Sequence, residues 1–365
     1  MKLRPRSILF TAIICLVVPS ATPAAAASAR AGLRTVDLGD WGHGGYVEDA
    51  NRRGEAAGAV NDENGNRQPV LWGRHGGPVP IGIGPGPSTA INNHGDVVGD
   101  NWLWSNGQLR TLTHPSGLVQ AVDINDRRQV IGNLSGAPGE FGQIFIWQNG
   151  RFTIIAAPAG LHGYLTAVNN RGEVLGYVVD ANWSARRAFV WRAGVMSLLD
   201  PLGGTVIDAR AINDRGQVVG YSSLPDSDVL HPFLWQDGRM TDLMAGRPTE
   251  GGYATDVNNA GDVVGNVGSR AVLWRGGRTV DLALPGLYGY ARLLNERGDV
   301  AGMVTSATPT GGQNQVFRWR NGRILLSEAY STEASLVFAG LDDQGRVTGM
   351  IDDMVSPIRP VRWLG

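Results

Sequence analysis

The chain has 365 residues, with 32 basic and 33 acidic side chains and a formal net charge of −1. Its only cysteine, Cys15, and its only lysine, Lys2, lie in the first 29 residues. A chain without that segment forms no disulfide and uses neither thiolate nor lysine Schiff-base chemistry. Losing the three basic residues of the segment changes the net charge from −1 to −4, which argues against nucleic acid as a partner.

The first 29 residues have the order of a secretory signal peptide. A basic head of Lys2, Arg4 and Arg6 precedes an apolar run over residues 8–18, and small residues lead to Ala29. This order predicts a signal peptide over residues 1–29 and a secreted mature domain over residues 30–365. The alternative is a membrane anchor. The apolar run is too short to span a bilayer and no later segment is long enough either, so we expect no membrane span.

Residues 33–39 form the next predicted element, a β-strand. Its sequence RTVDL at Arg34–Leu38 is repeated at Arg278–Leu282, where it follows a tryptophan-containing strand. At Arg34 no such strand precedes it, so this element needs a partner from elsewhere in the chain.

From residue 49 onward one ten-residue phrase recurs eight times. Its clearest form is AINDRGQVVG, which has apolar residues on both sides of an Asn-Asp-Arg-Gly turn. The copies are Asp49–Gly58, Ala90–Gly99, Asp123–Gly132, Ala167–Gly176, Ala211–Gly220, Asp256–Gly265, Leu293–Gly302 and Gly340–Gly349. Their last glycines are 33 to 47 residues apart, a period typical of propeller blades.

A second phrase, such as HPFLWQDGRMTDL at His231–Leu243, follows each copy of the first and contains a tryptophan. We interpret this tryptophan as a core anchor between repeats. Asn, Asp and Gly at the centre of each phrase favour tight hairpins, so each repeat has four strands, a to d. The sequence therefore predicts an all-β fold, a β-propeller of eight four-stranded repeats. The last repeat ends at Gly365 without a strand d, so residues 33–39 should complete it and close the ring.

These phrases resemble the HAF-repeat family of extracellular repeat proteins. The motif behind that name is similar to His231-Pro232-Phe233, Arg187-Ala188-Phe189 and Gln315-Val316-Phe317, each just before the repeat tryptophan. The resemblance covers nearly all of the mature chain and implies secretion and a propeller fold. It implies no defined activity and supplies no catalytic residues.

The variable segments of the repeat predict where a ligand would bind. The a–b and c–d turns are short and uniform, whereas the b–c and d–a connections vary in length, and we expect both variable sets on one face. Four repeats begin strand a with Gly-Tyr at the channel mouth of that face. These tyrosines could stack on a sugar or another flat ligand, or could simply cover the blade tops: Tyr46, Tyr164, Tyr253 and Tyr290.

Charged residues occur in strand a where most repeats have small ones. Acids stand two positions before the repeat asparagine at Asp49, Asp123 and Asp256, and charges stand one position earlier at Glu48, Arg210 and Arg292. Because strand a lines the channel, the carboxylates could bind a cation or act as general acid and base. We favour the alternative, in which they pair with the arginines in a hydrated channel.

The remaining chemistry is sparse. The six histidines have no metal-ligand spacing, and only His162 lies at the predicted mouth. Nucleophile-elbow, zinc and calcium-loop motifs are absent from the sequence. We predict no metal site and no cofactor.

Two functions follow from this pattern. The favoured one is a secreted, monomeric binding or interaction protein whose ligand, a small molecule, a glycan or a protein, lies at the channel mouth on the variable-loop face. The alternative is a secreted lyase, hydrolase or cyclase with its site at the same mouth. Fold alone does not decide between them.

Overall fold

The computed structural model describes residues 32–81, 88–135, 142–182, 186–309 and 311–365. Thirty-three β-strands and no helix occur in these ranges. The predicted signal peptide, residues 1–29, lies outside the described residues. Nowhere in the described ranges is there a helix with the length and apolar character needed to cross a bilayer.

The strands form eight repeating units. The a strands are β2 (Gly45–Ala50), β6 (Ser88–Ile91), β10 (Val119–Ile124), β14 (His162–Val168), β18 (Ile207–Ile212), β22 (Gly252–Val257), β26 (Tyr288–Leu294) and β31 (Ser335–Leu341). The b strands are β3 (Ala56–Asn61), β7 (Val97–Gly99), β11 (Val130–Leu134), β15 (Val174–Val179), β19 (Val218–Ser223), β23 (Val263–Val267), β27 (Val300–Thr308) and β32 (Val347–Asp352).

The c strands are β4 (Arg67–Trp72), β8 (Trp102–Ser105), β12 (Gln143–Gln148), β16 (Arg186–Arg192), β20 (Leu230–Gln236), β24 (Arg270–Arg275), β28 (Gly311–Arg320) and β33 (Arg359–Leu364). The d strands are β5 (Pro78–Pro80), β9 (Gln108–Thr111), β13 (Arg151–Ile155), β17 (Val195–Leu198), β21 (Arg239–Asp242), β25 (Arg278–Asp281), β29 (Arg323–Leu326) and, for the last unit, β1 (Arg34–Asp37).

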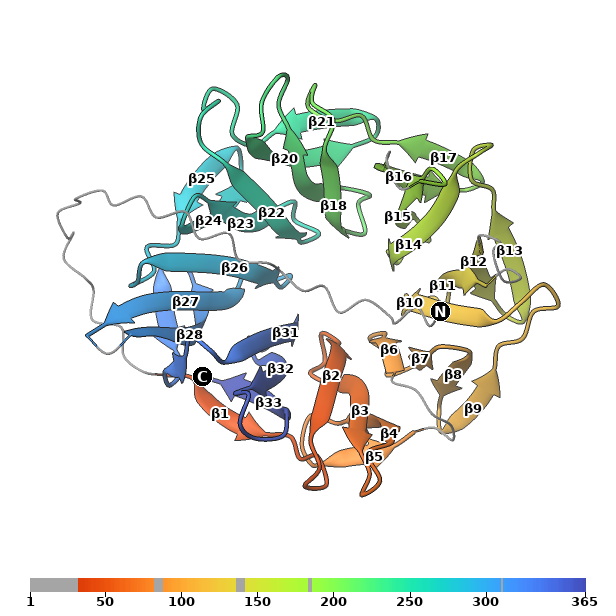
Figure 1. Ribbon diagram of the computed structural model, residues 1–365, viewed down its shortest axis with the longest axis horizontal. Coiled ribbons are helices and arrows are strands. Elements are labelled where there is room, and N and C mark those ends of the chain that lie inside the picture. The colour runs from red at the N-terminus through yellow and green to blue at the C-terminus, as the bar shows by residue number, and fades with distance from the viewer. Residues whose placement is uncertain (1–31, 82–87, 136–141, 183–185, 310) are drawn as a thin grey trace.

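Each unit is an antiparallel sheet in the order a, b, c, d, and the eight sheets stand in a ring around a central axis (Figure 1). The a strands lie nearest to this axis, and we call the region that they surround the channel. We number them as blades 1 to 8, beginning with β2. This confirms the predicted propeller. Blade 7 adds one feature that the repeat pattern did not predict, a short strand β30 (Tyr330–Ser331) that pairs with β28.

The ring closes as predicted. Strand β1 is antiparallel to β33, with Thr35 opposite Trp363. The Tyr330 hydroxyl lies 2.7 Å from Thr35 Oγ1 and accepts a 3.1 Å hydrogen bond from Trp363 Nε1. Strands from the two ends of the sequence therefore share blade 8, which removes the free sheet edge that an open ring would expose.

Apolar residues on both faces of each blade pack against the neighbouring blades. The repeat tryptophan is buried in six blades and half-buried at Trp104 and Trp191, in agreement with its predicted role as an anchor. A phenylalanine two residues before it is fully buried in four blades. These residues are Phe145, Phe189, Phe233 and Phe317.

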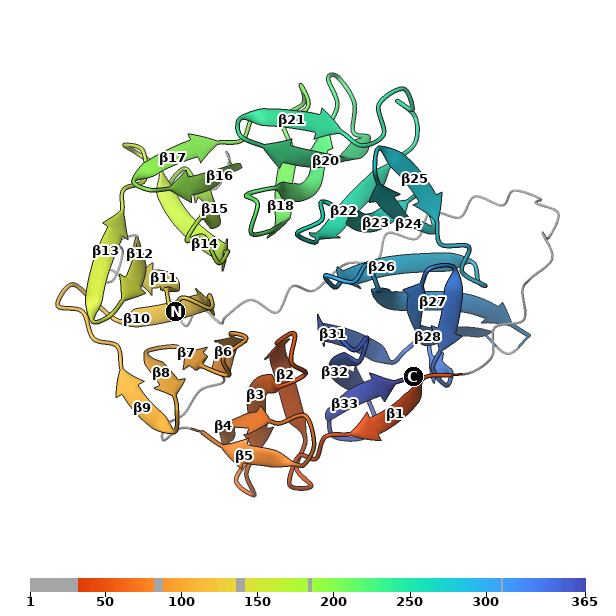
Figure 2. The ribbon, with the colours of Figure 1, turned by 180° about the vertical axis from the view of Figure 1, so that it is seen from behind.

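The two ends of the channel differ. Backbone hydrogen bonds join d–a loops to b–c loops, for example Ser135 N to Leu118 O at 2.9 Å and Gly268 N to Gly251 O at 2.9 Å. The variable loops therefore share one face, which we call the loop end of the channel. The a–b and c–d turns form the opposite face, the turn end. Figures 1 and 2 show the ring from its two sides.

Candidate functional site

A β-bulge recurs in strand a of every blade. In blade 1 the pairing moves from Val47 directly to Asp49, and Glu48 is left without a partner in the ladder. A bulge re-aims the side chain of the extra residue, and here none of the eight is buried. On the innermost strand these side chains line the channel. They are Glu48, Thr89, Val122, Thr166, Arg210, Thr255, Arg292 and Ala339.

The last glycine of the repeat phrase makes this bulge possible. A Cβ on Gly220 would lie 1.9 Å from the Asp208 carbonyl oxygen, and one on Gly302 would lie 1.9 Å from that of Tyr290. Such a close approach of two backbones admits only glycine. The repeated glycine and the channel-facing residue are thus two parts of one local structure.

The three predicted strand-a aspartates connect neighbouring blades. In each, one carboxylate oxygen accepts the amide hydrogen of the next residue and the other accepts an amide hydrogen of the following blade. For Asp123 the donors are Ile124 N at 2.7 Å and Val168 N at 2.8 Å. Asp49 and Asp256 are bonded in the same way to blades 2 and 7. Among the described residues, no cation forms an ion pair with these three aspartates. The predicted pairing with Arg210 and Arg292 is therefore not found; Arg210 pairs with Asp208 instead.

Enclosure in the ring changes the acidity of these groups. Burial raises the pKa of Asp123 to about 7, and the nearby Asp49 carboxylate raises it further while the two backbone amides lower it. Burial likewise raises the pKa of Asp49 and of Asp256 to about 6. Because both oxygens already accept amide hydrogens, we assign these residues to blade-to-blade contact ahead of acid–base chemistry.

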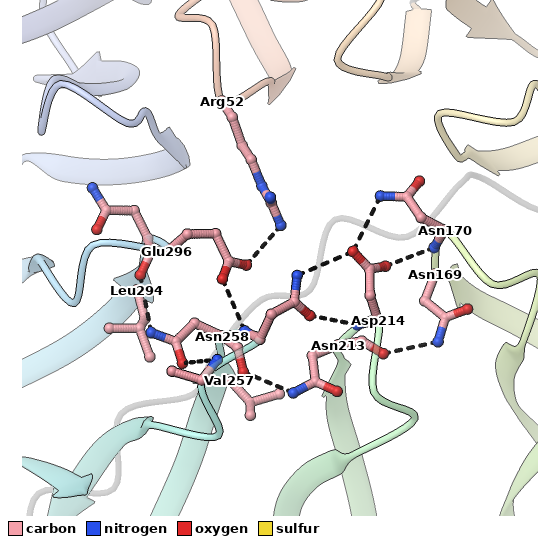
Figure 3. A network of polar contacts seen from close by, with 12 residues as sticks. Arg52, Asn169, Asn170, Asn213, Asp214, Val257, Asn258, Leu294 and Glu296 are labelled. Atoms are coloured by element: carbon pink, nitrogen blue, oxygen red, sulfur yellow. Dashed lines mark hydrogen bonds and ion pairs between the residues drawn. The ribbon is translucent and has the colours of Figure 1, made fainter.

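The repeat asparagine joins the blades at the turn end. Asn213 Oδ1 accepts the amide hydrogens of Arg215 and Gln217, which forms the a–b turn. Its Nδ2 donates to the carbonyl of Asn258 in the next blade at 2.7 Å. The same bond to the next blade recurs at Asn51, Asn92, Asn125, Asn169, Asn258 and Asn295. Figure 3 shows the part of this ring at Asn169 and Asn213.

A second polar ring lies beside the first and surrounds a cavity of about 270 Å³. It is made by the residue after each repeat asparagine. Asp214 accepts from Asn170 N at 2.7 Å, and Arg52 reaches Glu296 with an N–O distance of 2.7 Å (Figure 3). These side chains are occupied in bonds between blades, so the turn end is primarily structural.

The loop end presents a different set of side chains, five positions before the repeat asparagine. Tyr46, Tyr164, Tyr253 and Tyr290 hold this position in blades 1, 4, 6 and 7, as expected from the sequence. Blade 5 has Asp208 there. Within blades 4 to 7 the tyrosines are therefore interrupted by one acid, between Tyr164 and Tyr253.

Asp208 organises a compact polar cluster. Its Oδ1 lies 2.7 Å from the Tyr177 hydroxyl, and its Oδ2 accepts a 2.8 Å hydrogen bond from Tyr221. Arg210 Nη2 lies 3.1 Å from Oδ2, and Arg186 Nη2 lies 3.5 Å from Oδ1. The carboxylate is thus held by two hydroxyls and two guanidinium groups.

The next two blades continue this cluster with exposed aromatic surface. The Tyr253 ring packs edge-on against Tyr221 with 4.9 Å between centroids. Tyr253, Tyr288 and Tyr290 are 45%, 45% and 42% exposed. Burial raises the pKa of Tyr290, and so do the neighbouring Tyr288 and Tyr253. Tyr288 and Tyr290 lie two positions apart on β26 and therefore on the same face of that strand.

Arg292 follows Tyr290 by two residues on β26 and faces the channel as the extra residue of the blade 7 bulge. Burial within the ring lowers its pKa, and the charge of Arg210 lowers it further. None of the described residues forms an ion pair or a hydrogen bond with Arg292. We call the set of Asp208, Arg210, Tyr221, Tyr253, Tyr288, Tyr290 and Arg292 the tyrosine–arginine arc.

The remaining candidates lie outside the arc. On blade 1 the Arg67 guanidinium covers the Tyr46 ring at 4.4 Å. Glu48 faces the channel on the same blade, and burial raises its pKa while Arg67 lowers it. His162 and Tyr164 both lie on β14 of blade 4, where Tyr164 is paired with Tyr177 next to the Asp208 cluster. The structure therefore gathers Arg210, Tyr253, Tyr290 and Arg292, and separates them from Tyr46 and Glu48.

Sequence reasoning missed Asp208, Tyr221 and Tyr288. Asp208 carried a usable signal, because it departs from the tyrosine that four other repeats have at the same position. Tyr221 lies directly opposite it in strand b, and its contact with Tyr253 joins two blades. In the portion of the chain that the structure describes, no three His, Cys, Asp or Glu side chains are grouped so as to hold a metal ion.

Comparison with known proteins supports the fold alone. No family model and no curated protein matches the chain. Among solved structures, dipeptidyl peptidase 4 of Porphyromonas gingivalis is 10% identical with a TM-score of 0.52, over 81% of this chain and 55% of that one. A puromycin-hydrolyzing peptidase of Mycobacterium tuberculosis is 14% identical with a TM-score of 0.51, over 86% of this chain and 59% of that one. This chain thus spans less than two thirds of each of these peptidases. It belongs to the class of β-propeller proteins, and the resemblance to HAF-repeat proteins stays a prediction.

Proposed function

We propose that this protein is an exported β-propeller that binds a small molecule or glycan at the loop end of its channel, on the tyrosine–arginine arc. One observation carries the proposal: three tyrosines, each more than two fifths exposed, gather on blades 6 and 7 beside a channel-facing arginine. Aromatic surface beside a few convergent polar groups at a concave mouth is typical of ligand sites. Export is supported by the order of residues 1–29.

The pKa shifts of Tyr177 and Tyr221, the two tyrosines bonded to Asp208, favour ligand binding over acid–base catalysis. Burial and the adjacent Asp208 carboxylate raise the pKa of Tyr177, and burial also raises that of Tyr221. Both hydroxyls therefore release a proton less readily than an ordinary tyrosine at neutral pH. A general base needs a pKa near the working pH, so these groups suit orientation of a ligand better than proton transfer.

A ligand screen on the mature chain, residues 30–365, tests the proposal. Thermal-shift measurements with a library of glycans and small molecules should give at least one ligand, whose affinity is then measured by calorimetry. Tyr290→Ala should weaken its binding at least tenfold. The matched control is Trp41→Ala, since Trp41 is 44% exposed on a loop outside the arc.

Two outcomes would contradict the proposal. One is equal binding by the wild type and the Tyr290→Ala variant, with loss of binding in a variant elsewhere. The other is the absence of any ligand that depends on the arc. Mass spectrometry of each ligand after incubation separates binding from the enzymatic alternative, because only an enzyme converts its ligand.

A further inference from the structure

The charges of the arc are unevenly balanced. Asp208 is the acid of the cluster, and two guanidinium groups, those of Arg210 and Arg186, already lie within 3.5 Å of it. Arg292 adds another positive charge on the channel wall, with no counter-ion among the described residues. The arc therefore carries more positive than negative charge where it faces the channel.

This arrangement is costly without a ligand. Arg210 and Arg292 are both the extra residue of a bulge, so two backbones direct like charges toward the channel. Like charges repel, and an anion between them removes that cost. A guanidinium group also binds a carboxylate through two parallel N–H donors.

Aromatic faces and hydroxyl partners lie beside this charge. The rings of Tyr253 and Tyr290 are exposed at the mouth, and a sugar ring can stack its C–H face on such surfaces. The Tyr253, Tyr288 and Tyr290 hydroxyls can donate to or accept from sugar hydroxyls.

We infer that the arc binds an acidic saccharide, a uronic acid residue whose carboxylate lies on Arg292 and Arg210 and whose ring stacks on Tyr253 or Tyr290. The inference rests on the proposed function and names its ligand class. A carboxylate is favoured over a sulfate or phosphate cluster because Glu48 faces the same channel from blade 1, and its charge opposes a polyanion. One negative charge per sugar matches the modest positive excess of the arc.

The test compares matched ligands and matched variants of the mature chain. Calorimetry is performed with short oligomers of glucuronate, galacturonate and mannuronate, with the carboxyl-reduced form of each, and with a sulfated galactose oligomer. At least one uronate should bind at least tenfold more tightly than its reduced form, and added salt should narrow that difference. Arg292→Gln should reduce the preference for the uronate over its reduced form to about twofold or less, while the neutral, reduced oligomer still binds. Arg67→Gln, the same change on the opposite wall, should keep the preference.

Several outcomes would overturn the inference. These are equal or tighter binding of the reduced oligomers, tighter binding of the sulfated oligomer, and an unchanged preference in Arg292→Gln. Failure of every saccharide to bind also overturns it. The Tyr290→Ala comparison with the wider library still decides the proposed function, so the two failures are distinguishable. Near-ultraviolet circular dichroism of each variant shows that the propeller remains folded.

Discussion

Replacement of Asp123 by alanine should reveal a stability contribution that depends on pH. The carboxylate bonds blade 3 to blade 4 through the amide of Val168. Its pKa rises from 3.8 to about 7 in the folded protein. A folded pKa above the unfolded one means that Asp123 stabilises the fold most below about pH 4. That stabilisation is then lost as the pH rises through 7.

The magnitude follows from the same values. At about 1.4 kcal/mol per pKa unit, the rise to about 7 corresponds to at most roughly 4 kcal/mol. The side chain is only half-buried, and water in the channel screens part of the electrostatic cost of its charge. We therefore expect about half of that free energy. Alanine at this position is compatible with the fold, since Ala90, Ala167 and Ala211 occupy it in other blades.

The assay is denaturant unfolding of the mature wild type and Asp123→Ala, followed by tryptophan fluorescence at about pH 5 and about pH 8. The free-energy advantage of the wild type should be about 1 kcal/mol larger at the lower pH, because part of the total effect is already lost between about pH 4 and about pH 5. Asp200→Ala serves as control, since the Asp200 side chain is 86% exposed and forms a surface ion pair with Arg187. An advantage that is constant, or that grows with pH, would refute the reasoning.

Three further predictions concern the repeat structure. Asn213→Ala should lower the free energy of unfolding by roughly 3 kcal/mol, because it removes the turn bonds and the bond to blade 6 together; Asn213→Asp, which keeps only the acceptor, should recover part of this in the same unfolding assay. Gly220→Ala should lower it by at least about 3 kcal/mol, because its Cβ would overlap the Asp208 carbonyl, and near-native stability of this variant would contradict the proposed link between glycine and bulge. A mature chain that begins at residue 40 lacks the partner of Trp363 and should melt at a lower temperature and associate through the exposed edge of β33, as light scattering would show.

Much of the fold could be predicted because each repeat carries its own structure. The Asn-Asp-Arg-Gly turns and the tryptophan define the hairpins, and the unmatched strand at Arg34 has only one vacant place, beside β33. Which end of the channel is variable also follows from loop lengths.

The site was harder to predict because its partners are not coded locally. The bonds of Asp49, Asp123 and Asp256 go to backbone amides of another blade, and a backbone amide leaves no mark in a sequence. The repeat asparagine also donates a hydrogen bond to a backbone carbonyl of the next blade. The sequence does not indicate this second role, because the turn-forming role already explains why the asparagine recurs. Which charged residues gather in one arc depends on the order of the blades around the ring. Tyr46 is covered by Arg67, a residue outside the ten-residue phrase Asp49–Gly58.

The bulge explains why this scaffold can change its site without losing its fold. It needs the strand-b glycine, and it leaves the extra residue of strand a outside the ladder; only Val122 and Ala339 among the eight pack against the core. That residue is threonine in three blades, but glutamate or arginine in three others. Substitution there alters the channel wall while every ladder bond stays in place. Blades 5 and 7 carry arginine, and blade 5 also exchanges the mouth tyrosine for Asp208. These departures from the repeat coincide with the exposed tyrosines, and that coincidence is the strongest reason to look for the ligand on this side of the ring.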